Sequence, residues 1–260
     1  SVANTDTIYK VSQTVIFLPL SAQFIKLVNR LIPGTDVKQE GFSLQYINMT
    51  TVFSPTAAIV EAMQEIGRMG RKAEQNLRLS MEAFFDGDQS KIDQVYQTEK
   101  YIDYLSHEIT DYLVDVNQRQ LPVADSLKIG GLFHVVNDIE RIGDHGETLA
   151  KRARKLVEED VVFSDEAKAE LLQLSEMVLR ASGRSLEALE KNDKVIAEDA
   201  VRLCREVKQY QKEIRKNHIT RLNEHICNPT AGFVMMELLI NMKRVSDHSK
   251  NIAQLVQGTF

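Results

Sequence analysis

Apolar residues recur every three or four positions along most of the chain, which is the spacing that lines one face of an α-helix. The repeating pattern is broken at intervals by residues that end one helix and begin the next. It predicts six helices, at about 55–85, 88–117, 122–158, 164–191, 192–226 and 228–256. No segment alternates apolar and polar residues with the β-branched content of a strand, so we expect an all-α protein.

The predicted boundaries carry recognisable capping residues. Ser54-Pro55 and Asn228-Pro229 each place a capping side chain before a proline at the first helical position, where the missing N–H costs nothing. Asp86-Gly87-Asp88 should end the first helix, and Ser164 should cap the fourth. Gly130-Gly131 is expected to be a weak point in the third.

Residues 1–50 differ from the rest. Pro19 and Pro33-Gly34 interrupt a loose apolar pattern, which predicts a broken helix and a linker outside the main bundle, and a candidate segment for self-association into a homo-oligomer. The apolar run 14–20 is far shorter than the roughly 20 residues that cross a bilayer. Because the first residue is Ser rather than Met, we expect a fragment of a longer protein.

The two halves of the chain contain a repeated motif. Residues 139–145 (IERIGDH) align with residues 242–248 (MKRVSDH), and upstream of them Glu99 aligns with Glu206 and Asp103 with Tyr210. A duplicated unit of about 100 residues explains this. The sequence therefore predicts two tandem three-helix bundles, at 51–160 and 161–260, after the N-terminal segment 1–50.

Composition narrows the classes of function. The net charge of −5 leaves no basic field across the whole chain, which argues against nucleic acid as the main partner. The two cysteines have no metal-binding spacing and suit a reducing compartment such as the cytoplasm.

Two acidic pairs are candidates for chemistry. Glu99 and Asp103, like Glu140 and Asp144, are four residues apart, which places each pair on one face of a helix with about 6 Å between its members. Glu99 falls inside the apolar stripe of its helix, and Glu147 borders the stripe of the next one. A carboxylate that faces a core must be paired, hydrogen-bonded, protonated or bound to a metal.

A turn at Leu121-Pro122 would bring the two pairs level with each other, because it lies midway between them. Four converging carboxylates suit iron, manganese, zinc or magnesium, whereas the simpler interpretation is a set of surface carboxylates bridged to Lys and Arg. In the second unit only Glu206 and Asp247 remain, as weaker metal candidates, because Tyr210 and Lys243 replace two acids. His107 and His145 lie on outer angles and are expected to be surface residues.

The run 137–145 (NDIERIGDH), with Glu99-x-x-x-Asp103 upstream and a second copy downstream, resembles the PhoU family over about residues 55–256. The resemblance implies paired three-helix bundles, iron or zinc clusters at the acidic motifs, and restraint of phosphate uptake and of the phosphate-starvation response. Carried over by position, the metal ligands would be Glu99, Asp103, Glu140 and Asp144.

Residues 3–34 are also similar to the end of the membrane domain of bacterial sodium/phosphate cotransporters that carry a PhoU-like domain. We therefore expect a regulatory domain, not an enzyme, at the cytoplasmic face of the bacterial inner membrane, with a transporter domain or a phosphate-signalling protein as partner. The alternatives are a free-standing PhoU-type adaptor in the cytoplasm and a metal-free helical scaffold. A carboxylate-bridged metal oxidoreductase is disfavoured, because no Glu-x-x-His motif occurs at the acidic pairs.

Overall fold

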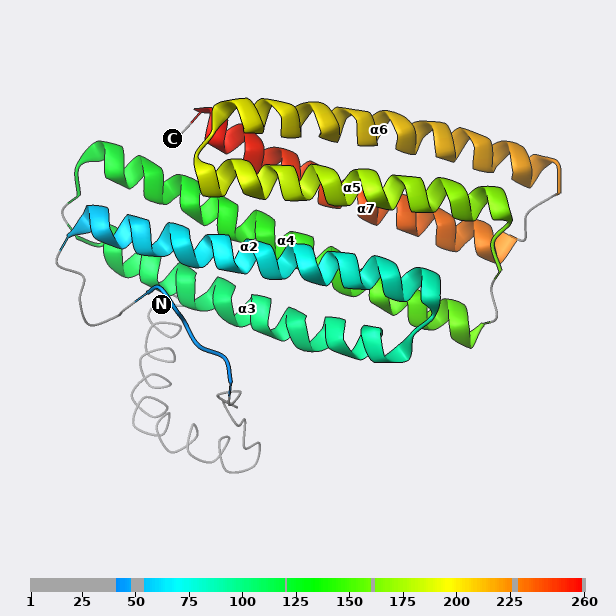
Figure 1. Ribbon diagram of the computed structural model, residues 1–260, viewed down its shortest axis with the longest axis horizontal. Helices are drawn as coiled ribbons and strands as arrows, with labels where there is room; N and C mark the ends of the chain where they lie inside the picture. The colour runs from blue at the N-terminus through cyan, green and yellow to red at the C-terminus, as the bar shows by residue number, and fades with distance from the viewer. Residues whose placement is uncertain (1–40, 48–53, 120, 160–161, 226–228, 259–260) are drawn as a thin grey trace, which may run out of the picture. The chain divides into compact units, whose positions relative to one another are not determined.

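The computed structural model describes residues 41–47, 54–119, 121–159, 162–225 and 229–258. All regular secondary structure in these ranges is helical: α2 (Pro55–Asp86), α3 (Gln89–Asn117), α4 (Val123–Glu158), α5 (Asp165–Lys191), α6 (Lys194–Asn223) and α7 (Pro229–Gly258) (Figure 1). The predicted all-α class is confirmed, and the helix ends agree closely with those read from the sequence. The broken helix predicted within residues 1–50 lies outside the described residues, except for 41–47.

The helices end where local chemistry favours a turn. Gly87 ends α2 with a φ of 66°, a left-handed conformation that glycine adopts without strain. Asp193 accepts hydrogen bonds from the first backbone N–H groups of α6. Helix α4 runs unbroken through Gly130-Gly131, the expected weak point. Ile129 and Leu132 on either side are fully buried, and their packing outweighs the cost of glycine, about 1 kcal/mol per residue.

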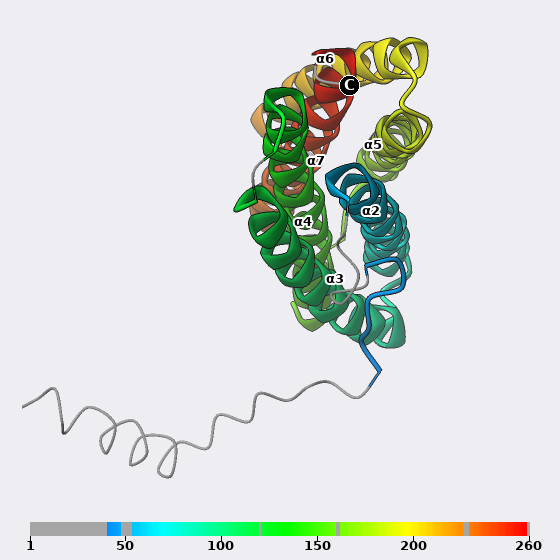
Figure 2. The same ribbon diagram turned by 90° about the vertical axis from the view of Figure 1, so that its left-hand side faces the viewer.

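The helices pack as two bundles of three. α2, α3 and α4 contact one another, and so do α5, α6 and α7, which confirms the predicted tandem arrangement. The bundles meet along α4 with α7 and along α2 with α5, as the second view shows (Figure 2). Buried apolar side chains from all six helices form one continuous core. None of these described helices combines the length and the apolar character that a membrane crossing requires.

A buried carboxylate fastens the chain that leads into the first bundle. Glu65 of α2 is fully buried and accepts hydrogen bonds from the backbone N–H groups of Gln45 (2.8 Å) and Tyr46 (2.7 Å). Arg68 forms an ion pair with Glu65 and donates to the hydroxyl of Tyr101 on α3 at 2.9 Å. The entry to α2 is therefore held by charge-assisted hydrogen bonds, which are roughly twice as strong as neutral ones.

Candidate functional site

The hairpin of α3 and α4 brings the two predicted acidic pairs together. The negative charges of Asp103, Asp144 and Glu147 all help to raise the pKa of Glu99. Those of Asp103 and Asp144 do the same for the pKa of Glu140. Two antiparallel helices joined by a short turn place residues equally far from that turn at the same level. We call these five residues the acidic cluster: Glu99, Asp103, Glu140, Asp144 and Glu147.

Glu99 is the buried member of the acidic cluster. Its residue is only 4 % exposed, and its carboxylate packs against the backbone of α4 at Gly143. A Cβ atom at position 143 would lie 2.7 Å from both carboxylate oxygens, so the glycine makes room for this side chain. One oxygen accepts a hydrogen bond from Asn76 Nδ2 at 3.1 Å, and the other has no hydrogen-bond partner among the described residues.

Burial and like charge oppose ionisation in the acidic cluster. Burial, reinforced by the charges of Asp103 and Asp144, raises the pKa of Glu99 to about 8, although the Asn76 hydrogen bond acts in the opposite direction. The pKa of Asp103 and that of Glu140 are also raised, mainly by burial and then by the charge of Asp144. The acidic cluster therefore favours any positive charge that reaches it, whether a proton or a cation.

Two basic side chains of α4 compensate the outer members of the acidic cluster. Arg141 donates to Asp144 at 2.8 Å, and Lys151 donates to Glu147 at 2.6 Å. Neither Glu99 nor Asp103 forms an ion pair within the described residues. In that same part of the chain, no three His, Cys, Asp or Glu side chains are arranged so as to hold a metal ion. The carboxylates are thus gathered but do not form a closed ligand set.

Among the described residues of the second bundle there is no comparable cluster. Glu206 and Asp247, the weaker metal candidates, form ion pairs with Arg202 and Lys243 of their own helices. Tyr210, which stands where the alignment expects an acid, donates to Gln173 of α5 at 2.7 Å. The lost acids are therefore replaced by a salt bridge and a hydrogen bond to the neighbouring helix.

Helix packing also corrects the alignment of α3 with α6. Ser246 is the counterpart of Gly143 in the second motif, and the side chain that hydrogen-bonds with it is Cys204. Cys204, not Glu206, therefore occupies the position that Glu99 has in the first bundle, two residues from the match made by sequence. The sequence could not show this, because the register of two packed helices depends on contacts rather than on residue identity.

The two histidines near the acidic pairs differ from each other. His107 is 74 % exposed, as expected, and lies near Asp111. His145 is not a surface residue, which corrects the prediction: it lies between α4 and α7 with its Nδ1 3.0 Å from Asn241 Oδ1. Burial lowers the pKa of His145. A helical wheel of α4 alone could not reveal this, because the residues that cover His145 belong to the other bundle.

The junction of α4 and α7 is built from equivalent residues of the two repeats. Asp138 Oδ1 lies 2.8 Å from His248 Nδ1 and accepts a hydrogen bond from Asn251 at 3.1 Å. Asn241 is the repeat counterpart of Asp138, and it pairs with His145 as Asp138 pairs with His248. The two imidazole rings lie 5.6 Å apart. Sequence reasoning missed this role, although the signal was present as a histidine seven residues after Asp or Asn in both repeats.

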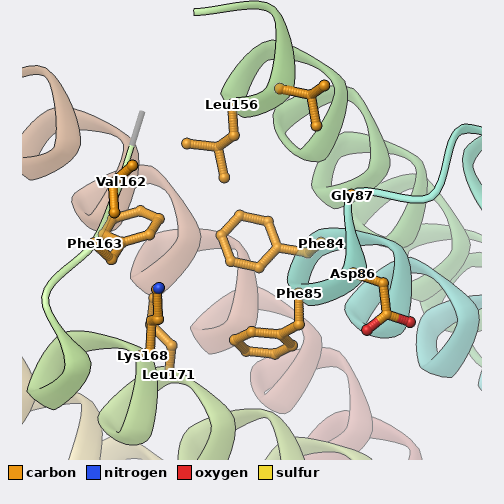
Figure 3. Close-up of a pocket in the computed structure, with 10 residues that line it drawn as sticks. Phe84, Phe85, Asp86, Gly87, Leu156, Val162, Phe163, Lys168 and Leu171 are labelled. Carbon is orange, nitrogen blue, oxygen red and sulfur yellow. The ribbon is translucent and has the colours of Figure 1, made fainter. Parts of the chain in front are cut away.

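A separate apolar hollow lies where the end of α2, the end of α4 and the start of α5 meet (Figure 3). It has a volume of about 370 Å³ and is lined by aromatic and aliphatic side chains, among them Phe84, Phe163 and Leu171. Its charged lining residues are Asp86, which is paired with Lys91, and Lys168. None of the acidic cluster lines this hollow, so it is not part of the candidate site.

Comparison with known proteins identifies the family. The family model "PhoU domain" matches the chain twice, at residues 66–153 and 171–256. The chain belongs to the PhoU family. It is 26 % identical to the "phosphate-specific transport system accessory protein PhoU homolog" of Pseudomonas aeruginosa, over 77 % of this chain and 82 % of that protein. The homolog of the same name from Synechocystis is 27 % identical, over 76 % of this chain and 88 % of that protein.

Solved PhoU structures share the fold. PhoU from Pseudomonas aeruginosa superposes with a TM-score of 0.73 at 24 % identity, covering 78 % of this chain and 97 % of that one. The phosphate transport system regulatory protein PhoU from Streptococcus pneumoniae gives a TM-score of 0.70 at 17 % identity, with 78 % and 95 % covered. The two bundles described above thus follow the architecture of known PhoU proteins.

The raised pKa of Glu99 predicts that stability falls with rising pH. In the unfolded chain this carboxyl has a pKa near 4.5, so between about pH 5 and 8 the folded state binds the proton more tightly. The free energy of unfolding should therefore decrease across that range, at about 1.4 kcal/mol per unit of pKa difference, several kcal/mol in all. Glu99→Gln should abolish the decrease, measured by urea unfolding of chelator-treated protein at pH 5 and pH 8.5.

Glu206→Gln is the matched control for this measurement, because Glu206 lies at the surface beside Arg202. This variant should retain the pH dependence of the unsubstituted protein. A Glu99→Gln protein that loses stability with pH as steeply as the unsubstituted one would contradict the assignment.

The junction of the repeats gives a second prediction. Asp138→Ala removes the acceptor of the half-buried His248 and of the exposed Asn251, and each lost hydrogen bond costs about 0.5–1.5 kcal/mol. The variant should unfold at clearly lower urea concentration than the unsubstituted protein. His107→Ala, at an exposed position, should change the free energy of unfolding by no more than about 0.5 kcal/mol. Equal stability of the two variants would show that the junction contributes little.

Proposed function

We propose that this protein is a regulatory accessory protein of phosphate transport and that it acts through the acidic cluster rather than by catalysis. The proposal is supported chiefly by the two PhoU domain matches, together with relatives named as accessory proteins of phosphate-specific transport systems. The expected partner is a membrane phosphate transporter or a phosphate-signalling protein. Its place of action would be the cytoplasmic face of the membrane that holds the transporter.

The accessory-protein reading is preferred to that of a domain fused to a sodium/phosphate cotransporter. The likeness to a cotransporter rests on residues 3–34, which lie outside both the described residues and the family matches. The relatives compared above are named as accessory proteins and match this chain over more than four fifths of their own length. The alternative of a free-standing adaptor is therefore the better supported of the two.

The acidic cluster suits a divalent cation in its chemistry. Its donors are all carboxylate oxygens, which are ligands for hard and borderline cations such as magnesium, manganese, iron and zinc. One buried oxygen of Glu99 has no hydrogen-bond partner among the described residues, whereas the buried oxygen of Glu140 lies 3.2 Å from Arg141 Nε. The Glu99 oxygen is therefore the atom that most lacks a partner. Glu99, Asp103, Glu140 and Asp144 would hold the ion, with Glu147 beside them.

A cation at this place would supply positive charge between two helices. Glu99 and Asp103 project from α3, whereas the remaining members belong to α4. Neutralising their mutual repulsion would hold the two helices together and favour the ionised form of Glu99. The outer surface of the first bundle, where Asp103 is exposed, would thereby change its charge with occupancy. A partner protein could recognise this change in surface charge.

A metal-free scaffold is the second candidate, and specific contacts favour it. Arg141 and Lys151 already neutralise Asp144 and Glu147, and the carboxylates do not form a closed ligand set. In this reading Glu99 stays protonated near neutral pH, because burial raises its pKa to about 8. The two readings differ in whether purified protein carries metal.

The hypothesis of a metal site predicts that the purified protein contains metal in a fixed ratio to the chain and that this metal is held by the acidic cluster. Elemental mass spectrometry of untagged protein should find about one or more iron, zinc or manganese ions per chain, and Glu99→Gln with Asp103→Asn should lose them. Glu206→Gln with Asp247→Asn removes the same two charges at ion-paired positions and should retain the metal. Protein without metal, even after incubation with each ion, would leave the metal-free scaffold as the remaining reading.

The regulatory role predicts an effect on phosphate uptake in cells. In a bacterial host that lacks its own PhoU protein, expression of this chain should restore the restraint of phosphate uptake. The Glu99→Gln, Asp103→Asn variant should fail to do so, whereas the Glu206→Gln, Asp247→Asn control should succeed, with uptake of radiolabelled phosphate as the readout. Folding of each variant is checked by helical circular dichroism. Unaltered uptake on expression of the unsubstituted chain would contradict the regulatory proposal.

A further inference from the structure

Helix α6 is strongly basic in an acidic chain. Its thirty residues contain eight Lys or Arg and four Asp or Glu, a net charge of +4, whereas the whole chain has a net charge of −5. The rest of the protein therefore carries about −9, so the charge is separated rather than mixed. Such separation creates a local positive field that attracts anionic surfaces.

Five of these cations form one row along the helix surface. At 3.6 residues per turn they fall within an arc of about 100°, and all five are exposed. We call this row the basic stripe: Arg205, Lys208, Lys212, Arg215 and Lys216. No acidic residue of α6 between positions 205 and 216 falls within the arc, since Glu206 and Glu213 lie beyond its edge.

The basic stripe is not neutralised by the protein itself. Within the described residues none of its five members forms an ion pair. The other arginines of α6 do, since Arg202 pairs with Asp199 and Glu206, and Arg221 pairs with Glu170. Glu206 is thus already engaged by Arg202, and the charge of the stripe is available to a binding partner.

The basic stripe faces away from α5, one of the two helices that α6 contacts. Tyr210 and Asn217, which lie on the opposite side of α6, donate hydrogen bonds to Gln173 and Glu170 of α5. Helix α6 contacts only α5 and α7 among the described helices and lies at the margin of the structure in both views (Figures 1 and 2). A flat surface could therefore approach the stripe from the side opposite α5.

Two exposed apolar side chains of α7 extend this face. Phe233 is 61 % exposed and Ile240 is 52 % exposed, and seven residues separate them, so they share one side of the helix. One flank of α7 contacts α4 through Glu237 and Asn241. The other flank contacts α6 through Gly232 and Ser246. The side that carries Phe233 and Ile240 lies between these two flanks.

The level of these apolar side chains follows from the contacts between α6 and α7. His218 lies against Gly232, and Cys204 lies against Ser246, so the two helices are antiparallel. Phe233 and Ile240 therefore lie level with the part of α6 that carries Lys208 to Lys216. The face combines a row of cations with two apolar side chains beside it.

We infer that this face of α6 and α7 binds the surface of an anionic phospholipid bilayer. Long basic side chains attract acidic headgroups over a Debye length, and neighbouring apolar side chains insert at the boundary of the acyl chains. A specific protein interface would instead be centred on a desolvated apolar core that is poor in lysine. Here three of the five cations are lysines and the apolar side chains lie at one side. The inference does not depend on the acidic cluster or on phosphate regulation.

Sedimentation with lipid vesicles tests the inference on the whole chain. The protein should bind vesicles that contain one third phosphatidylglycerol and should not bind pure phosphatidylcholine vesicles. Each cation near an anionic bilayer contributes about a fivefold factor to binding, so reversing three of them should weaken partitioning by at least about a hundredfold. The variant is Arg205→Glu, Lys208→Glu, Lys212→Glu, and raising the salt concentration from 0.1 M to 0.5 M should weaken the unsubstituted protein similarly.

The matched control reverses three exposed cations elsewhere: Lys100→Glu, Lys128→Glu, Arg180→Glu. It has the same net charge as the stripe variant and should keep most of the binding. A second variant, Phe233→Ser with Ile240→Ser, keeps all charges and should bind more weakly than the unsubstituted protein. Equal loss in the control and the stripe variant, or equal binding to both vesicle types, would overturn the inference. So would an absence of vesicle binding, which would assign the stripe to solvent or to an acidic protein.

Discussion

The antiparallel packing of α4 against α7 is the contact on which the rest of the structure depends, because it joins two bundles into one continuous core. It uses equivalent polar residues of the two repeats, with Asp138 bound to His248 and Asn241 bound to His145. Half-buried polar pairs of this kind require defined geometry, so they specify one register where apolar packing alone would permit several. Glu140, Asp144 and Glu147 of the acidic cluster lie on α4 as well, so their position also depends on this junction.

The acidic cluster shows how close packing and chemistry combine. Gly143 allows the carboxylate of Glu99 to enter between α3 and α4, and the resulting burial raises its pKa to about 8. A carboxylate kept in such a place without a full set of partners costs stability. Proteins tolerate such costs mainly at functional sites. This is the physical reason for proposing the acidic cluster as the functional site.

The two repeats have diverged into different surfaces on the same architecture. The first has a buried carboxylate with four others around it, whereas the second has Cys204 at the corresponding position and a salt bridge between Lys243 and Asp247. The second has instead a row of unpaired cations on α6. Duplication allows this division, since either bundle can keep its apolar core while the outer residues change. In the functions proposed above, the first repeat would supply the responsive site and the second the surface that binds the bilayer.

The sequence by itself determined the helices, their order and the duplication, because apolar periodicity and capping residues act within a few residues of chain. It also singled out Glu99 as a carboxylate facing a core. Only the tertiary structure decided that Cys204 rather than Glu206 corresponds to Glu99, that His145 is covered by α7, and that Phe233 and Ile240 extend the basic stripe. These facts depend on which helices meet and in what register, and that is settled by packing between residues that are far apart in the sequence, such as His145 and Asn241.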